Sequence, residues 1–106
     1  MERCDVLVLG GGPAGSSCAW GLRDSRLDVV VADRAAFPRD KVCAGWITPQ
    51  ILTALGIELE DYRKERVMQP IRGFSLARQG DVATLVDCGE VVSFGIRRCE
   101  FDHYLL

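Results

Sequence analysis

Three glycines near the start of the chain have the spacing of a phosphate-binding turn. Gly10, Gly12 and Gly15 fit the pattern G-x-G-x-x-G. In this pattern the first glycine permits a tight turn, the second lets the backbone approach a pyrophosphate, and the third lets a helix pack closely on a strand. Asp33 follows near the distance, roughly 20 residues further on, at which an acidic side chain binds ribose hydroxyls. These residue types and spacings predict the binding of a dinucleotide.

A strand, a helix and a second strand must position these residues. Residues 4–9 are almost continuously apolar, as a central parallel strand is, and residues 29–31 form a second apolar run. Between them we predict a helix from Pro13, which suits a first helical turn, to about Arg23. A right-handed crossover brings the carboxyl ends of both strands to one edge, where the helix N-terminus offers unpaired N–H groups to phosphates. The sequence therefore predicts an α/β fold built on a Rossmann-like βαβ unit.

Small apolar residues recur along this helix with helical periodicity, which would let it lie close to the sheet. They are Gly15, Cys18, Ala19 and Leu22. Ser16, Arg23 and Asp24 are expected on the wetter side of the helix. We expect Cys4 and Cys18 to be small side chains of the core.

The segment after Asp33 reads as a loop and then as helices. Residues 34–46 contain Phe37-Pro38, which disfavours a helix, and three basic residues, so their composition favours a solvated connector. A helix is predicted to begin with Thr48 as its cap and Pro49 in its first turn, and to end at Gly56. The mixed charges of residues 58–66 indicate a solvated helical face.

The last third of the chain favours antiparallel strands. Residues 71–77 and 82–86 are predicted to form a hairpin around a turn at 78–81, with a further strand at 91–94 and a helix near the end. Two parallel strands alone leave sheet faces uncovered, so the domain is expected to be an incomplete N-terminal piece that needs the rest of a parent chain. Its expected parts are the βαβ unit with following helices (1–67), the β-hairpin region (68–97) and the start of a helix (98–106).

Composition narrows the class of protein. The chain has 106 residues, which is enough for one small domain. Its formal net charge of −2 argues against a nucleic-acid partner. No apolar run approaches the roughly 20 residues of a transmembrane helix. Five cysteines without a C-x-x-C pair favour thiols in a reducing cytoplasm over disulfides or a zinc site, and the single histidine, His103, is expected to be solvated.

Three segments, taken in order, resemble the geranylgeranyl reductase family within the para-hydroxybenzoate-hydroxylase-like flavoproteins. Asp5-Val6-Leu7-Val8-Leu9-Gly10-Gly11-Gly12-Pro13-Ala14-Gly15-Ser16 looks like the family's FAD fingerprint. Phe37-Pro38-Arg39-Asp40-Lys41-Val42-Cys43-Ala44-Gly45 looks like its F-P-R-x-K-x-C-G-G loop, with Ala44 in place of the first glycine of C-G-G. Arg98-Cys99-Glu100-Phe101-Asp102-His103-Tyr104-Leu105 looks like its R-x-x-F-D-x-x-L helix start. The fingerprint alone also fits NAD, and the three segments together favour FAD.

The resemblance implies roles for individual positions. The FAD pyrophosphate would be held by the turn that comprises Gly10, Gly12, Pro13, Ala14 and Gly15. Asp33 would bind the adenosine ribose and Arg34 would lie near the adenine. Cys43 and Ala44 would lie beside the flavin, and Arg98 would reach back to the cofactor. No catalytic residue is implied within this chain.

The resemblance also implies an FAD-dependent oxidoreductase that reduces carbon–carbon double bonds in a prenyl-type substrate, with NAD(P)H as a candidate electron donor. The small-molecule substrate would bind outside this segment. One alternative is an FAD-dependent monooxygenase, hydroxylase or halogenase-like enzyme. Two others are a nucleotide-binding fragment without catalysis and an NAD(P)-binding domain in which Arg34 engages a ribose phosphate.

Overall fold

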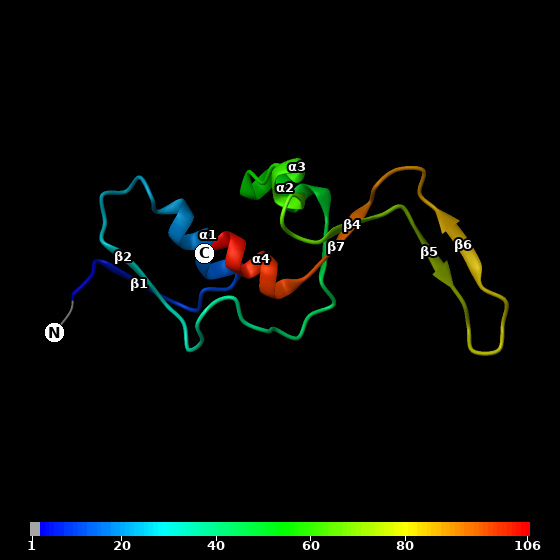
Figure 1. The fold of residues 1–106 in the computed structure, drawn as a ribbon, viewed down its shortest axis with the longest axis horizontal. Helices are drawn as coiled ribbons and strands as arrows, with labels where there is room; N and C mark the ends of the chain where they lie inside the picture. Colours follow the sequence, from blue (N-terminus) through cyan, green and yellow to red (C-terminus); the bar gives the residue numbers. More distant parts are fainter. Residues whose placement is uncertain (1–2) are drawn as a thin grey trace. The chain divides into compact units, whose positions relative to one another are not determined.

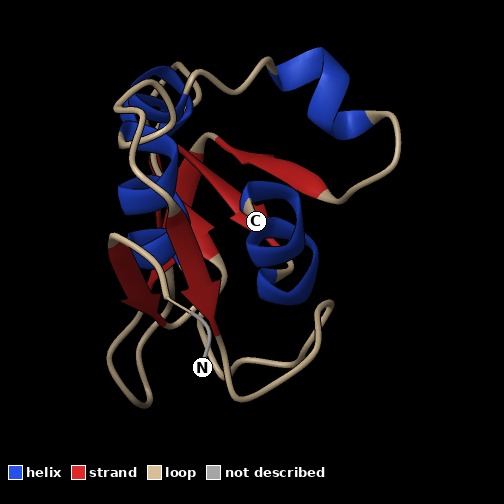
Figure 2. Ribbon diagram, turned by 90° about the vertical axis from the view of Figure 1, so that its left-hand side faces the viewer, coloured by secondary structure: helices blue, strands red, loops and turns tan. Residues whose placement is uncertain are grey.

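The computed structural model describes residues 3–106 and divides the chain into two compact units (Figures 1 and 2). The first unit contains the chain up to Val42 together with Arg98–Leu106, and the second contains Cys43–Arg97. Figure 2 shows that long loops join the short helices and strands.

The first unit is a parallel βαβ unit completed by a helix from the end of the chain. Strands β1 (Val6–Leu9) and β2 (Val29–Ala32) pair in parallel, and helix α1 (Pro13–Gly21) connects them. Helix α4 (Arg98–Leu105) contacts α1, and Figure 1 shows these blue and red helices side by side. This architecture confirms the predicted α/β fold with a Rossmann-like unit.

Backbone geometry explains the turn between β1 and α1. Gly10 has φ +102°, a conformation that side chains rarely adopt, and its N–H donates to the Ala32 carbonyl at 2.7 Å. Gly12 is the N-cap of α1 in extended conformation, and Pro13 opens the helix where its missing N–H costs nothing. A Cβ on Gly15 would collide with the Gly10 carbonyl oxygen, so helix and strand approach each other there as closely as glycine allows.

Three expectations about side-chain burial were wrong. Ser16 is buried with 4% exposure, because its hydroxyl donates to the Gly11 carbonyl at 3.1 Å and its polarity is thereby satisfied inside the turn. Cys4 and Cys18 are exposed, not core residues. The two-stranded sheet is partly uncovered, as expected, since Leu9 is 78% exposed.

The second unit contains two antiparallel sheets and two short helices. One sheet has the order β3-β7-β4 and the other pairs β5 with β6. The strands are β3 (Trp46–Ile47), β4 (Met68–Ile71), β5 (Gly73–Leu76), β6 (Thr84–Asp87) and β7 (Ser93–Ile96). The helices are α2 (Pro49–Leu55), which ends at a left-handed Gly56 as predicted, and α3 (Leu59–Arg63). The buried apolar side chains of the second unit are Leu52, Ile57, Tyr62, Met68, Phe94 and Ile96.

The predicted hairpin is present, but its first strand is divided. Residues 71–77 were expected to form one strand, whereas the chain changes partners at Arg72. Ile71 ends the pairing of β4 with β7, and the Arg72 carbonyl accepts a hydrogen bond from the Cys88 N–H just beyond β6. Gly73 then opens β5, where a Cβ would collide with the Val86 carbonyl oxygen, so this crossing of strands requires glycine.

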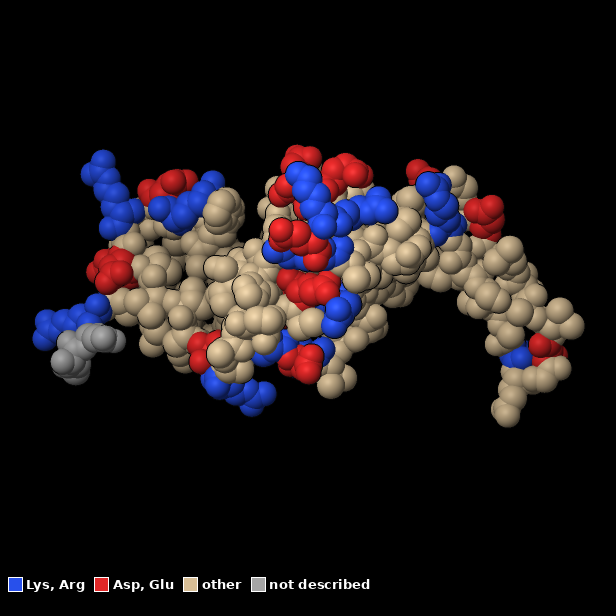
Figure 3. Space-filling view, in the orientation of Figure 1, with Lys and Arg blue, Asp and Glu red and all other residues tan. Residues whose placement is uncertain are grey.

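The charged side chains form no extended patch of one sign among the described residues on the face shown in Figure 3, where acidic and basic groups are interspersed. Within residues 3–106 the structure contains no helix that is both long enough and apolar enough to cross a membrane.

Candidate dinucleotide-binding site

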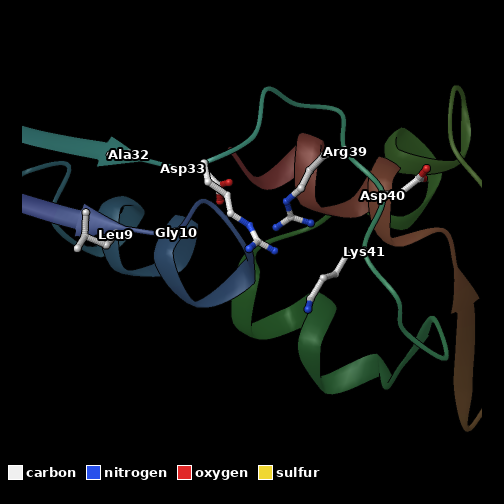
Figure 4. A pocket seen from close by; sticks show the side chains of 8 residues that line it. Leu9, Gly10, Ala32, Asp33, Arg39, Asp40 and Lys41 are labelled. Atoms are coloured by element: carbon white, nitrogen blue, oxygen red, sulfur yellow. The ribbon is translucent and has the colours of Figure 1, made fainter.

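A cavity of about 560 Å³ lies in the first unit where the two parallel strands end. Leu9 and Ala32 are the last residues of β1 and β2, and both line it. The remaining lining residues are Gly10, Asp33, Arg34, Arg39, Asp40 and Lys41 (Figure 4). Ligands of open α/β sheets bind outside the carboxyl ends of the strands, so the cavity occupies the predicted edge.

Asp33 connects the end of β2 to the glycine turn. Its Oδ2 accepts a hydrogen bond from the Gly11 N–H at 2.8 Å, and its Oδ1 accepts one from the Ala35 N–H at 2.9 Å. These two backbone donors lower the pKa of the Asp33 carboxyl below its ordinary value, with smaller contributions from the positive charges of Arg39 and Arg34. An ionised carboxylate accepts about four hydrogen bonds. Asp33 can therefore hold the turn and still accept from ribose hydroxyls.

The lowered pKa of Asp33 predicts how acid affects stability. A depressed carboxyl pKa contributes stability above the unfolded-state value of about 4, and that contribution is lost as pH falls through the lower folded-state pKa. We expect Asp33→Asn to lower the thermal midpoint at pH 7, and the difference from wild type to shrink below about pH 4. Thermal unfolding followed by circular dichroism between pH 7 and pH 2 measures this. Asp24→Asn, at an exposed position, is the control, and a wild-type to Asp33→Asn difference that does not change with pH would contradict the prediction.

Arg39 comes from the loop that composition indicated to be a solvated connector, and for this residue that interpretation was wrong. Its side chain is only 18% exposed, and its Nη1 donates to the Asp102 carboxylate at 3.0 Å. Its guanidinium carbon lies 4.7 Å from the centre of the Phe37 ring. Figure 4 shows Arg39 and Lys41 extending into the cavity from one loop, whereas Asp40 points away.

Asp102 is the residue that the sequence reasoning missed. Its carboxylate is fully buried and accepts hydrogen bonds from Arg98 Nε at 2.8 Å and Arg98 Nη2 at 3.0 Å, in addition to the one from Arg39. The i,i+4 spacing of Arg98 and Asp102 on a predicted helix was a signal for the first pair. The sequence contains no local signal for the contact with Arg39.

The predicted site residues differ in where the structure places them. Gly10, Asp33 and Arg34 line the cavity. Gly12 caps α1, and Pro13, Ala14 and Gly15 lie in its first turn. Arg98 is engaged with Asp102 through two of its nitrogens, and its contact with a cofactor stays a prediction.

Cys43 and Ala44 belong to the second unit and are exposed. The Cys43 sulfur accepts a hydrogen bond from the Gly45 N–H at 3.4 Å. Their predicted place beside a flavin stays a prediction.

Comparison with known proteins agrees with this geometry. Residues 8–39 match the model of an NAD(P)-binding Rossmann-like domain. The chain is 54% identical over 54 residues to menaquinone reductase of Mycolicibacterium smegmatis, an alignment that covers 50% of this chain and 13% of that protein. It is 46% identical over 50 residues to geranylgeranyl diphosphate reductase of Rhodobacter capsulatus, covering 47% of this chain and 12% of that protein.

Two solved structures share the fold over almost the whole chain. A geranylgeranyl bacteriochlorophyll reductase-like protein from Thermoplasma acidophilum superposes with a TM-score of 0.80 at 24% identity, covering 99% of this chain and 27% of that one. The flavin-dependent halogenase CmlS superposes with a TM-score of 0.65 at 31% identity, covering 100% of this chain and 20% of that one.

The two sequence alignments thus cover only roughly an eighth of these curated relatives' length, and the chain covers 27% of the Thermoplasma acidophilum structure. The regions of similarity include the glycine turn and the strand that leads to Asp33, which build the cavity described above. In sequence the chain is thus similar to these reductases, and in fold to the reductase-like protein and the flavin-dependent halogenase.

Proposed function

We propose that the chain is the FAD-binding part of an oxidoreductase that reduces carbon–carbon double bonds in a prenyl-type substrate. The observation that carries the binding proposal is the turn at Gly12. Gly12 has φ −74° and ψ −177°, which any residue adopts, and a Cβ built on it would approach nothing closer than the Arg39 guanidinium at 3.6 Å. Neither conformation nor packing within the described residues requires glycine at this position, whereas a pyrophosphate approaching the backbone does.

The charge of the cavity supports an anionic ligand. The positively charged lining residues are Arg34, Arg39 and Lys41, of which Arg39 also pairs with Asp102; the negatively charged ones are Asp33 and Asp40, of which Asp40 points away from the cavity (Figure 4). The α1 N-terminus adds its partial positive charge, because no acidic side chain lies in its first turn and no side chain caps it. A diphosphate would bind at the positively charged glycine turn, and the adjoining ribose would donate hydrogen bonds to the Asp33 carboxylate.

The residues of this chain would bind and orient the cofactor, and would not react themselves. Bound FAD supplies the hydride chemistry, while the protein supplies position and electrostatics. Gly10 and Gly12 would shape the turn, Asp33 would bind the ribose, and Arg34 would lie at the adenine end. The names of the two reductases above support reduction as the reaction. The substrate site would lie outside this chain, NAD(P)H is the proposed electron donor, and the proposed location is the cytoplasm.

A second candidate is an NAD(P)-binding domain. The matching family model describes NAD(P) binding, and Arg34 lines the cavity next to Asp33, where it could bind a ribose phosphate. The likeness to a flavin-dependent enzyme favours FAD.

An absorption spectrum of the purified chain tests the two candidates. We expect flavin absorption bands to survive desalting after FAD is added, because the glycine turn would hold the pyrophosphate. Titration calorimetry with NADP⁺ is the matched measurement. Binding of NADP⁺ without retention of FAD would overturn the FAD proposal and support the second candidate.

A further inference from the structure

The guanidinium of Arg39 is held in one orientation by two contacts. Its Nη1 donates to the buried Asp102 carboxylate at 3.0 Å, and its plane lies near the Phe37 ring, with 4.7 Å from the guanidinium carbon to the ring centre. Arg98 donates two further hydrogen bonds to the same carboxylate. An arginine anchored in this way has lost most of its side-chain freedom before any ligand arrives.

The second terminal nitrogen of Arg39 is directed at the glycine turn. Nη2 lies 3.6 Å from the position that a Cβ on Gly12 would occupy, and it has no hydrogen-bond partner among residues 3–106. Arg39 also lines the cavity (Figure 4). The anchored guanidinium therefore offers a donor at the place where the pyrophosphate is expected.

Arg39 and Arg98 share the Asp102 carboxylate. One carboxylate faces two guanidinium groups, and Arg98 alone already pairs with it through two hydrogen bonds. Neutralising Asp102 therefore does not require Arg39. Arginine is well suited to phosphate oxygens because its nitrogens donate in a fixed fork, and Nη2 of Arg39 is the nitrogen that faces the glycine turn.

We infer that Arg39 is a phosphate ligand of the dinucleotide site and that Asp102 is the positioning residue that presents it. This inference rests on the proposed function and deepens it, since it assigns the diphosphate to a particular side chain. Asp102 would act only through Arg39. Helix α4, near the end of the chain, would thereby contribute to a binding site that is formed mainly by residues near the start of the chain.

Calorimetric titration of the 106-residue chain with ADP and with adenosine tests the role of Arg39. ADP carries the diphosphate and adenosine lacks it. In Arg39→Gln we expect the affinity for ADP to fall by roughly tenfold or more, since a charge-assisted hydrogen bond is lost, while the affinity for adenosine stays unchanged. Arg78→Gln removes the same charge from an exposed turn of the second unit and should leave both affinities unchanged.

A double-mutant cycle tests the role of Asp102. Asp102→Asn should weaken ADP binding several-fold when Arg39 is present, and should cause no further loss in the Arg39→Gln background. A role of Asp102 in stability alone would instead weaken ADP and adenosine alike in both backgrounds, and would overturn its assignment. Circular dichroism shows whether each variant is folded, and Arg39→Gln alone tests the ligand role if Asp102→Asn does not fold.

The outcomes separate this inference from the proposed function. ADP binding by wild type that Arg39→Gln retains in full would overturn the assignment of Arg39 and leave the dinucleotide site standing. Absence of both FAD and ADP binding in the wild-type chain would overturn the proposed function and the assignment together.

Discussion

Gly15→Ala is expected to destabilise the chain by about 3 kcal/mol or more, because the added methyl group has no space. Its Cβ would collide with the Gly10 carbonyl oxygen, and would lie 3.0 Å from the Gly10 carbonyl carbon and 3.2 Å from Val8 Cγ1. The backbone cannot easily retreat, since the Gly10 N–H is bonded to Ala32 at 2.7 Å and Val8 is paired in β1. Small domains have only about 5–15 kcal/mol of stability, so the loss is a large share.

Urea unfolding followed by far-ultraviolet circular dichroism measures this loss. Gly21→Ala is the matched control, because Gly21 is the last residue of the same helix and a Cβ there would meet nothing within 4 Å. We expect the control to be as stable as wild type or more stable by up to about 1 kcal/mol, since alanine is the better helix former. A Gly15→Ala variant with the stability of Gly21→Ala would show that α1 does not pack on the turn as described.

The βαβ part of the first unit could be predicted well from the sequence, because the patterns that specify it involve residues close together in the chain. The strand-turn-helix-strand order, the G-x-G-x-x-G spacing and the capping of α1 each depend on residues that are neighbours in sequence. The errors arose where polarity was taken as a sign of exposure. Ser16 is polar and yet buried, because the Gly11 carbonyl in the glycine turn accepts a hydrogen bond from its hydroxyl. Cys18 is apolar and yet exposed, because α1 presents that side of the helix to solvent.

The candidate site could be predicted only in part, for a different physical reason. Gly12 and Asp33 belong to one motif whose spacing is diagnostic, and the predicted edge of the sheet holds the cavity. The anchoring of Arg39 by Asp102 joins residues that are 63 positions apart. A contact of that sequence separation depends on how α4 packs beside α1, and no periodicity or composition of either segment encodes it.

Gly12→Val is expected to abolish binding of FAD while the chain stays folded. In the absence of a ligand the valine Cβ meets only the end of the Arg39 side chain at 3.6 Å, and the extended backbone at this position suits valine. The loss of a good N-cap residue costs only about 1 kcal/mol or less. A pyrophosphate held by the turn, however, would need the space that the valine side chain fills.

Equilibrium dialysis with FAD measures this effect, and we expect the affinity to fall by at least roughly a hundredfold, or about 3 kcal/mol. Gly21→Ala serves again as the control, because it lies at the other end of α1 and should bind FAD as wild type does. Far-ultraviolet circular dichroism should be alike for all three proteins. Gly15→Ala is expected to lose stability, whereas Gly12→Val is expected to lose only FAD binding. The two variants therefore distinguish the glycine that the fold requires from the glycine that the ligand requires. Wild-type affinity for FAD in a folded Gly12→Val chain would mean that the pyrophosphate does not approach this turn, and the assignment of the cavity would then be wrong.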